Sequence, residues 1–165
     1  MLDLLTQAKA ALPVLLRQPV GDWNSLDVDY EPPRVERLWW PFGGQYRLML
    51  HRIHPCTEAL WHPHPWPSAV EVVEEAYEMG VSYHGPEEPL VTMVLKAGSS
   101  YEMLNPKAWH YVRPLEKPSL SIMVIGQPYE KQVYDHSNYG KNRDLKPLTD
   151  EAKLDLVKAF QKHFA

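Results

Sequence analysis

The chain has 165 residues, of which 44% are hydrophobic, and it carries a formal net charge of −4 at pH 7. This length suits a single domain over residues 1–165, and the composition excludes an intrinsically disordered chain. The mild acidity and the lack of a basic run argue against nucleic acid and membrane surfaces as partners. The single cysteine, Cys56, allows no disulfide within the chain, which favours a cytoplasmic location.

The first 19 residues predict a helical arm. Apolar residues recur at helical spacing over residues 2–12, and Pro13 breaks or kinks the segment before it ends at Pro19. The segment is interrupted by charged residues and lacks a basic start, so we do not interpret it as a signal peptide. No stretch of the sequence is long enough to span a bilayer. Residues 20–33 are expected to form an ordered loop.

Residues 34–128 predict a β-rich core, because short apolar runs are separated by sequences typical of turns. We expect strands at 34–40, 45–53, 69–73, 76–84, 90–98, 110–114 and 119–126. This pattern predicts an all-β fold, either a conical β-barrel or a double-stranded jelly roll, with N- and C-terminal helices packed outside it.

A loop at 135–144 leads to the predicted C-terminal helix at 149–164. Thr149 is a suitable N-cap for this helix. Leu154, Val157 and Phe160 lie on one face of it, which we expect to be buried.

Two histidines one residue apart, His62 and His64, lie among the prolines of the segment WHPHPWP. A residue before proline favours extended backbone, and side chains two apart on an extended segment point to the same face. The pair can therefore meet one metal ion. His110, which follows a turn at the start of a predicted strand, is the candidate third ligand.

These segments resemble the cupin family over about residues 45–128. The first cupin motif, G-x5-H-x-H-x3-4-E-x6-G, is carried by HPHPWPSAVEVVEE, and the second, P-x-G-x2-H-x3-N, by GSSYEMLNPKAWH. Ser68 stands where the motif has its glutamate. Glu71 is the nearest carboxylate. The alternation of side chains along a strand directs Glu71 away from the metal, although a bulge in the segment PWPS would bring it in as a fourth ligand. The resemblance implies a metal held by three histidines.

A three-histidine site is similar to that of cupins of the cysteine dioxygenase type. The segments QYRLMLHRI, WHYVRP and PSLSIMVIGQPY follow in the same order as in that group. The group's Ser-His-Tyr run is replaced here by Ser121, Met123 and Ile125. Its substrate-binding arginine would fall near Arg34 or Arg37, out of register with both. The resemblance thus implies the fold and the metal rather than a thiol substrate.

The resemblance implies a mononuclear iron(II) dioxygenase that acts on a small anionic chelating substrate together with dioxygen. Three neutral imidazoles leave open positions on iron(II), and zinc or nickel would also fit. Arg52 would be a carboxylate clamp at the barrel mouth if the face it shares with Leu48 and Leu50 points inward. Tyr101 is a candidate hydrogen-bond donor to the substrate.

The alternative is a metal cupin without redox chemistry, either a small-ligand binding or sensing domain or a zinc- or nickel-dependent isomerase or lyase. The missing Ser-His-Tyr run favours this alternative. The cupin resemblance and the apolar strand at 34–40 also favour a homodimer.

Overall fold

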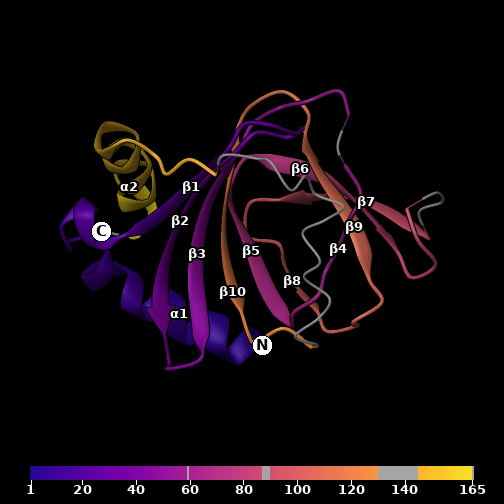
Figure 1. Cartoon of the computed structure of the whole chain (residues 1–165), viewed down its shortest axis with the longest axis horizontal. Coiled ribbons are helices and arrows are strands. Elements are labelled where there is room, and N and C mark those ends of the chain that lie inside the picture. Colours follow the sequence, from indigo (N-terminus) through magenta and orange to yellow (C-terminus); the bar gives the residue numbers. More distant parts are fainter. Residues whose placement is uncertain (59, 87–89, 130–144, 165) are drawn as a thin grey trace.

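The structure, a computed structural model, describes residues 1–58, 60–86, 90–129 and 145–164. Within these residues it forms two antiparallel β-sheets with a helix from each end of the chain (Figure 1). The helices are α1 (Leu2–Leu15) and α2 (Asp150–Phe164), and a 3-10 turn, η1, spans Val20–Asp22. None of the described helices is long and apolar enough to cross a membrane. The loop predicted at 135–144 lies outside the described residues.

The larger sheet has six strands and the smaller sheet has four, as the described residues define them. In spatial order the larger sheet contains β1 (Asn24–Val28), β2 (Val35–Phe42), β3 (Tyr46–Ile53), β10 (Ser119–Ile125), β5 (Ser68–Glu74) and β8 (Ser100–Met103). The smaller sheet contains β4 (His62–Pro63), β9 (Trp109–Pro114), β6 (Ala76–Ser82) and β7 (Val91–Lys96). The arrangement is that of a double-sheet jelly roll, and the strand ladders of the described residues do not join the sheets into a closed barrel.

The helices cover the outer face of the larger sheet, opposite the smaller sheet (Figure 1). Side chains alternate along a strand, so every second residue of β3 and β10 faces the helices. On this face Leu48, Leu50 and Ile122 are fully buried together with Leu12 of α1 and Phe160 of α2. This layer contains the larger of the two apolar clusters, and its burial from water stabilises the fold.

The inner face of the larger sheet turns toward the smaller sheet. A second apolar cluster lies there, formed by the buried side chains Ile53, Val72, Tyr77 and Met79. This cluster is smaller than the outer one, and the same interior also holds buried polar side chains. The space between the sheets is therefore where a polar site can be built.

The structure corrects three details of the predicted elements. The segment predicted as a loop at 20–33 contains η1 and β1, and β1 pairs with β2 at the edge of the larger sheet. The strand β8 was not predicted, although its residues pair with β5. Leu154 is 42% exposed, because α2 docks through Leu156, Val157 and Phe160 instead.

Two features of the helices bear on the sequence predictions. The backbone N–H of Ala152 donates to Thr149 Oγ1 over 3.2 Å, which confirms Thr149 as the N-cap of α2. Pro13 lies inside α1, which continues to Leu15, so the helix is not ended there.

The packing of α2 can be tested by truncating Phe160, which is fully buried. We expect Phe160→Ala to lower the free energy of unfolding by about 3–5 kcal/mol, because it removes apolar contacts and leaves a cavity. Leu154→Ala, on the exposed side of the same helix, should cost less than about 1 kcal/mol. Denaturant unfolding followed by circular dichroism measures both losses, and equal losses would contradict this docking of α2.

Candidate functional site

The pairing of β4 with β9 brings the three predicted histidines together. His62 lies directly opposite His110 in the antiparallel register. The pairing continues past β4, since the backbone N–H of His64 donates to the carbonyl of Ala108 over 2.9 Å. The flanking prolines favour extended backbone, and His62 and His64 therefore project from one face toward His110.

The three imidazole rings are in contact. The ring centroid of His110 lies 4.3 Å from that of His62 and 4.9 Å from that of His64, both edge to face. His64 and His110 are only 4% and 6% exposed. The sequence prediction thus named three side chains that the fold does place in one cluster.

Backbone carbonyls orient two of the rings. The Nδ1 of His62 lies 3.1 Å from the carbonyl oxygen of Leu60, and the Nδ1 of His64 lies 3.0 Å from that of Trp66. A carbonyl oxygen can only accept, so each Nδ1 carries the proton, and a neutral ring then has its lone pair on Nε2. Metal-binding histidines typically have this arrangement, in which a second group fixes the ring and the tautomer.

Burial keeps the cluster neutral. Burial lowers the pKa of His64 to about 4, with a smaller contribution from the neighbouring His62. The pKa of His110 lies well below its ordinary value for the same reason, with His62 and His64 adding to the effect. Burial also lowers the pKa of His62, against the opposing effect of its bond to Leu60. Neutral imidazole is the form that binds a metal ion.

Three neutral imidazoles are suitable ligands for a divalent metal ion, although the three rings do not yet point their lone pairs at one common position. Among the described residues, no group of three or more His, Cys, Asp or Glu side chains stands ready to hold a metal ion. The Nδ1 of His110 is buried and has no hydrogen-bond partner among the described residues. The His110 ring can therefore rotate without breaking a hydrogen bond of Nδ1, and this rotation would redirect the lone pair of the ring. The rings of His62 and His64 are already fixed by their bonds to backbone carbonyls.

Ser68 lies beside the cluster and Glu71 lies away from it. Ser68 is fully buried, and its Oγ is 3.5 Å from Nε2 of His64, which is a long contact for a hydrogen bond. Both carboxylate oxygens of Glu71 are bonded to the Lys9 ammonium of α1, at 2.6 and 2.7 Å. Glu71 therefore belongs to the contact between α1 and β5 and does not lie at the histidine cluster.

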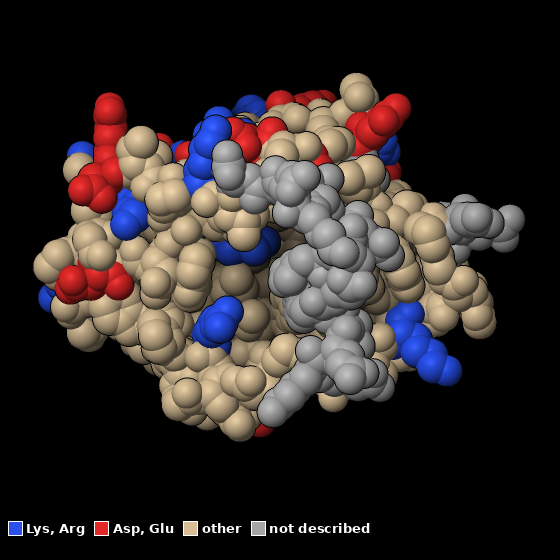
Figure 2. All heavy atoms as spheres, in the orientation of Figure 1, with Lys and Arg blue, Asp and Glu red and all other residues tan. Residues whose placement is uncertain are grey.

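A pocket of about 330 Å³ opens next to this region. It is lined by Arg37, Arg47 and Met49 of β2 and β3, by Trp66 beside His64, by Ile125 at the end of β10, and by residues 126–128 after it. Figure 2 shows basic side chains in and beside a hollow on this face of the molecule. The volume falls in the range of small-molecule sites, and the two guanidinium groups favour an anionic ligand.

Arg52 does not lie at the histidine cluster. The face of β3 that carries Leu48, Leu50 and Arg52 points outward to the helices, so the condition for an inward Arg52 is not met. Its Nη1 atom instead lies 3.1 Å from Glu36 and 2.8 Å from Asp155 of α2. Arg52 is therefore an ion-pairing residue between the larger sheet and α2, which corrects its predicted role as a carboxylate clamp.

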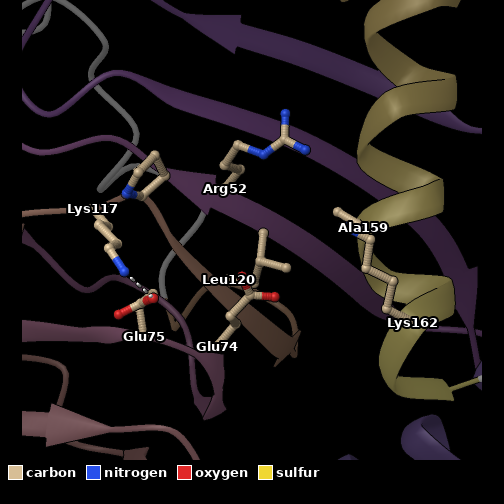
Figure 3. Close-up of a pocket in the computed structure, with 8 residues that line it drawn as sticks. Arg52, Glu74, Glu75, Lys117, Leu120, Ala159 and Lys162 are labelled. Carbon is tan, nitrogen blue, oxygen red and sulfur yellow. Dashed lines mark hydrogen bonds and ion pairs between the residues drawn. The ribbon is translucent and has the colours of Figure 1, made fainter.

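The outer pocket that Arg52 lines, of about 270 Å³, carries charges of both signs (Figure 3). Lys117 pairs with Glu75 over 3.4 Å, and Glu74 pairs with His163 of α2 over 2.7 Å. Because acidic and basic side chains offset each other, this pocket gives no preference for a charged ligand.

Tyr101 of β8 is half-buried and packs against the inner apolar cluster. Its hydroxyl lies 2.9 Å from that of Tyr77, and burial raises the pKa of Tyr101 to about 12. The phenol therefore stays protonated at neutral pH. Its predicted role toward a substrate stays a prediction.

Sequence reasoning missed the position of two basic residues, Arg37 and Arg47, at the pocket. Arg37 was considered only as a near match to the arginine of the family, and Arg47 was not singled out. The alternation of side chains along the strands could have found them, because Arg37 and Arg47 share the inner face with Met49 and His51 when β2 pairs with β3.

Comparisons with known proteins bear on the fold. No family model matches the sequence, and no curated protein matches it. Among solved structures, the chain resembles hydroxypropylphosphonic acid epoxidase from S. wedmorenis, with a TM-score of 0.54 and 14% identity over 67% of this chain and 58% of that one. A structure of FeII HppE gives a TM-score of 0.52 at 14% identity, over 66% of this chain and 58% of that one.

A third structure, an RmlC-like cupin from Shewanella frigidimarina NCIMB 400, has a TM-score of 0.48 and 17% identity over 67% of this chain and 88% of that one. At such identities the likeness extends to the fold alone. The two higher-scoring matches support the double-sheet jelly roll described above. The chain spans 58% of the length of these two proteins.

The depressed pKa of His64 predicts that the metal-free protein loses stability in mild acid. Between its ordinary pKa of 6.5 and about 4, His64 binds a proton in the unfolded chain but not in the folded one. The free energy of unfolding should therefore fall as the pH falls through this range, by up to about 1.4 kcal/mol per pH unit for this group.

Denaturant unfolding in the presence of a chelator, from pH 7 to pH 5, measures this slope. His64→Gln should reduce the slope by up to about 1.4 kcal/mol per pH unit, the contribution of one proton. An identical slope in His64→Gln and the unsubstituted chain would show that His64 is not buried as a neutral base.

Proposed function

We propose that this protein is a metal-dependent cupin in which His62, His64 and His110 are the metal ligands. The observation that carries the proposal is the contact of the His110 ring with the rings of His62 and His64. His64 and His110 are buried, and His62 and His64 each donate an Nδ1–H to a backbone carbonyl. Ser68, which stands where the cupin motif has its glutamate, lies 3.5 Å from Nε2 of His64, and this supports a ligand set of three histidines without a carboxylate.

We further propose a mononuclear iron(II) dioxygenase that acts on a small anionic substrate. When bound, iron(II) supplies Lewis-acid chemistry and the capacity to react with dioxygen. Arg37 and Arg47 would bind the negative charge of the substrate in the adjoining pocket, and Trp66 would limit the access of water from the side of His64. Tyr101 would act as a neutral hydrogen-bond donor.

One observation favours the alternative, a metal cupin without redox chemistry. Ile125 lines the pocket where the cysteine dioxygenase type has its tyrosine, so no hydroxyl is offered there. A zinc- or nickel-dependent lyase or isomerase, or a binding domain, needs no such group. The closeness to the cysteine dioxygenase type, a homodimer and a cytoplasmic location stay predictions.

Metal content tests the ligand set. We expect His64→Ala to lose most of the bound metal while its circular dichroism stays largely unchanged, because the larger apolar cluster contains none of the three histidines. Glu71→Gln is the matched control and should keep its metal, since Glu71 pairs with Lys9. Elemental analysis of the purified variants gives both values. Retained metal in His64→Ala would refute the proposed ligand set.

The nature of the metal separates the two functions. Protein purified without added metal should contain iron and should consume dioxygen with small anionic chelators such as enolates or thiolates, measured with an oxygen electrode. Tightly held zinc or nickel, with no oxygen consumption after reconstitution with iron(II), would favour the alternative. His64→Ala serves as the inactive control in the oxygen assay.

A further inference from the structure

We propose that strand β7, the edge of the smaller sheet, is the interface at which two copies of this chain pair as a two-fold symmetric dimer. The proposal goes beyond the proposed function and does not depend on the metal. It also moves the expected dimer contact. The apolar strand predicted at 34–40 cannot offer an edge to a partner, because its residues from Val35 onward belong to β2, which pairs with β1 and β3.

The edges of the two sheets differ in their protection. An edge strand leaves backbone N–H and C=O groups without partners, and proteins blunt such edges by covering, shortening or charging them. Within the described residues, Asp27 of β1 bonds to Lys146 over 2.8 Å, β4 has only two residues, and β8 has four. In contrast, β7 (Val91–Lys96) has six residues, pairs there only with β6, and contains no proline and a single charged residue.

One bond at the end of β7 fixes which of its backbone groups point outward. Lys96 lies opposite Ala76, and the N–H of Ala97 donates to the carbonyl of Glu75 over 2.9 Å. In an antiparallel ladder a bond in this place flanks a residue pair that exchanges no hydrogen bonds, and the two kinds of pair alternate along the strand. Residues of β7 at an even spacing from Lys96 therefore direct their N–H and C=O groups away from β6.

Thr92 and Val94 are the residues of β7 at this spacing. No backbone partner for their outward groups lies among the described residues. The N–H of Lys96 also points outward, but it donates to Ser99 Oγ over 3.2 Å. The free N–H groups of the edge are thus those of two residues, which lie on either side of Met93.

This pattern is complementary to itself. If a two-fold axis passes through Met93, Thr92 of one copy lies opposite Val94 of the other, and each such pair exchanges both of its N–H···O=C bonds. The two pairs together use every outward N–H and C=O group of these residues. A register shifted by two residues would instead place Thr92 opposite Lys96, whose N–H is already bonded to Ser99.

Side chains and charge favour the same arrangement. Leu90, Val91 and Val94 are 57%, 48% and 53% exposed, and pairing would remove part of this apolar area from water. The two Lys96 ammonium groups would lie at opposite ends of the paired strands, whereas parallel pairing would set these like charges side by side. Because β7 lies on the side of the molecule away from α1 and α2 (Figure 1), the helices leave room for the second copy.

The oligomeric state of the full chain tests the proposal. Sedimentation equilibrium should show a mass that rises from monomer to dimer with concentration. Thr92→Pro should weaken the dimer at least about tenfold, because it removes an outward N–H that β6 does not use, and proline is tolerated at such edge positions. Thr92→Ala is the matched control, since it also loses the side chain but keeps the N–H, and it should dimerise like the unsubstituted chain. Circular dichroism should be the same for both variants.

Cross-linking tests the register. In a Cys56→Ser background, Met93→Cys should form an intermolecular disulfide on mild oxidation, because the two copies of a residue on the axis lie about 4.5 Å apart, within the reach of a disulfide. The two copies of Val94→Cys would lie diagonally, about 7–8 Å apart, and should cross-link at least about tenfold more slowly. The amide protons of Thr92 and Val94 should also become protected from hydrogen exchange as the dimer forms.

Three outcomes would overturn the proposal: a monomer at all concentrations up to about 1 mM, whether or not the edge then binds an extended peptide; a dimer that a folded Thr92→Pro leaves intact; or equal cross-linking of Met93→Cys and Val94→Cys. Cross-linking and hydrogen exchange decide the matter even if Thr92→Pro does not fold. Metal content keeps this test apart from the proposed function. A chain that binds no metal would refute the proposed function, while the sedimentation and cross-linking results still decide the role of β7.

Discussion

The proline-rich segment at 62–67 is bonded to both sheets, and the site depends on this double attachment. On one side the His64 N–H donates to Ala108, next to β9. On the other side the carbonyls of this segment accept from the backbone N–H groups of Gly126 and Tyr129, which follow β10, both at 2.9 Å. A side chain at Gly126 would meet Pro67 at 2.9 Å, so the close approach requires glycine. The histidines are thus held where the two sheets meet, and the pocket opens beside them.

The charged side chains of the outer face and those of the pocket have different surroundings. On the outer face of the larger sheet, carboxylates and basic groups pair across elements, as Lys9 does with Glu71 and Arg52 with Asp155. Near the interior site the buried histidines are neutral, and arginines line the pocket. Paired charges suit docking of the helices, whereas a neutral cluster beside positive charge suits a metal ion and an anion together.

Stability and function therefore draw on different parts of the same sheet. The larger apolar cluster joins the helices to the outer face, and it involves none of the three histidines. The apolar cluster on the inner face is the smaller one, and the buried polar side chains Ser68, Ser121 and His51 are tolerated on this face because the outer layer stabilises the fold. A binding site can vary in such an interior without loss of the scaffold.

The sequence alone determined the features that depend on local periodicity. Alternation along an extended segment placed His62 and His64 on one face, the cupin motif added His110 as the third histidine, and strand parity turned Glu71 away. The tertiary structure decided which face of each strand packs against the helices and which faces the interior. Both faces of β3 are buried, so its apolar pattern could not tell the interior from the helix-covered side, and Arg52 was assigned to the wrong one. The bond between Arg37 and His51 likewise joins neighbouring strands whose register comes from pairing, which no single strand encodes.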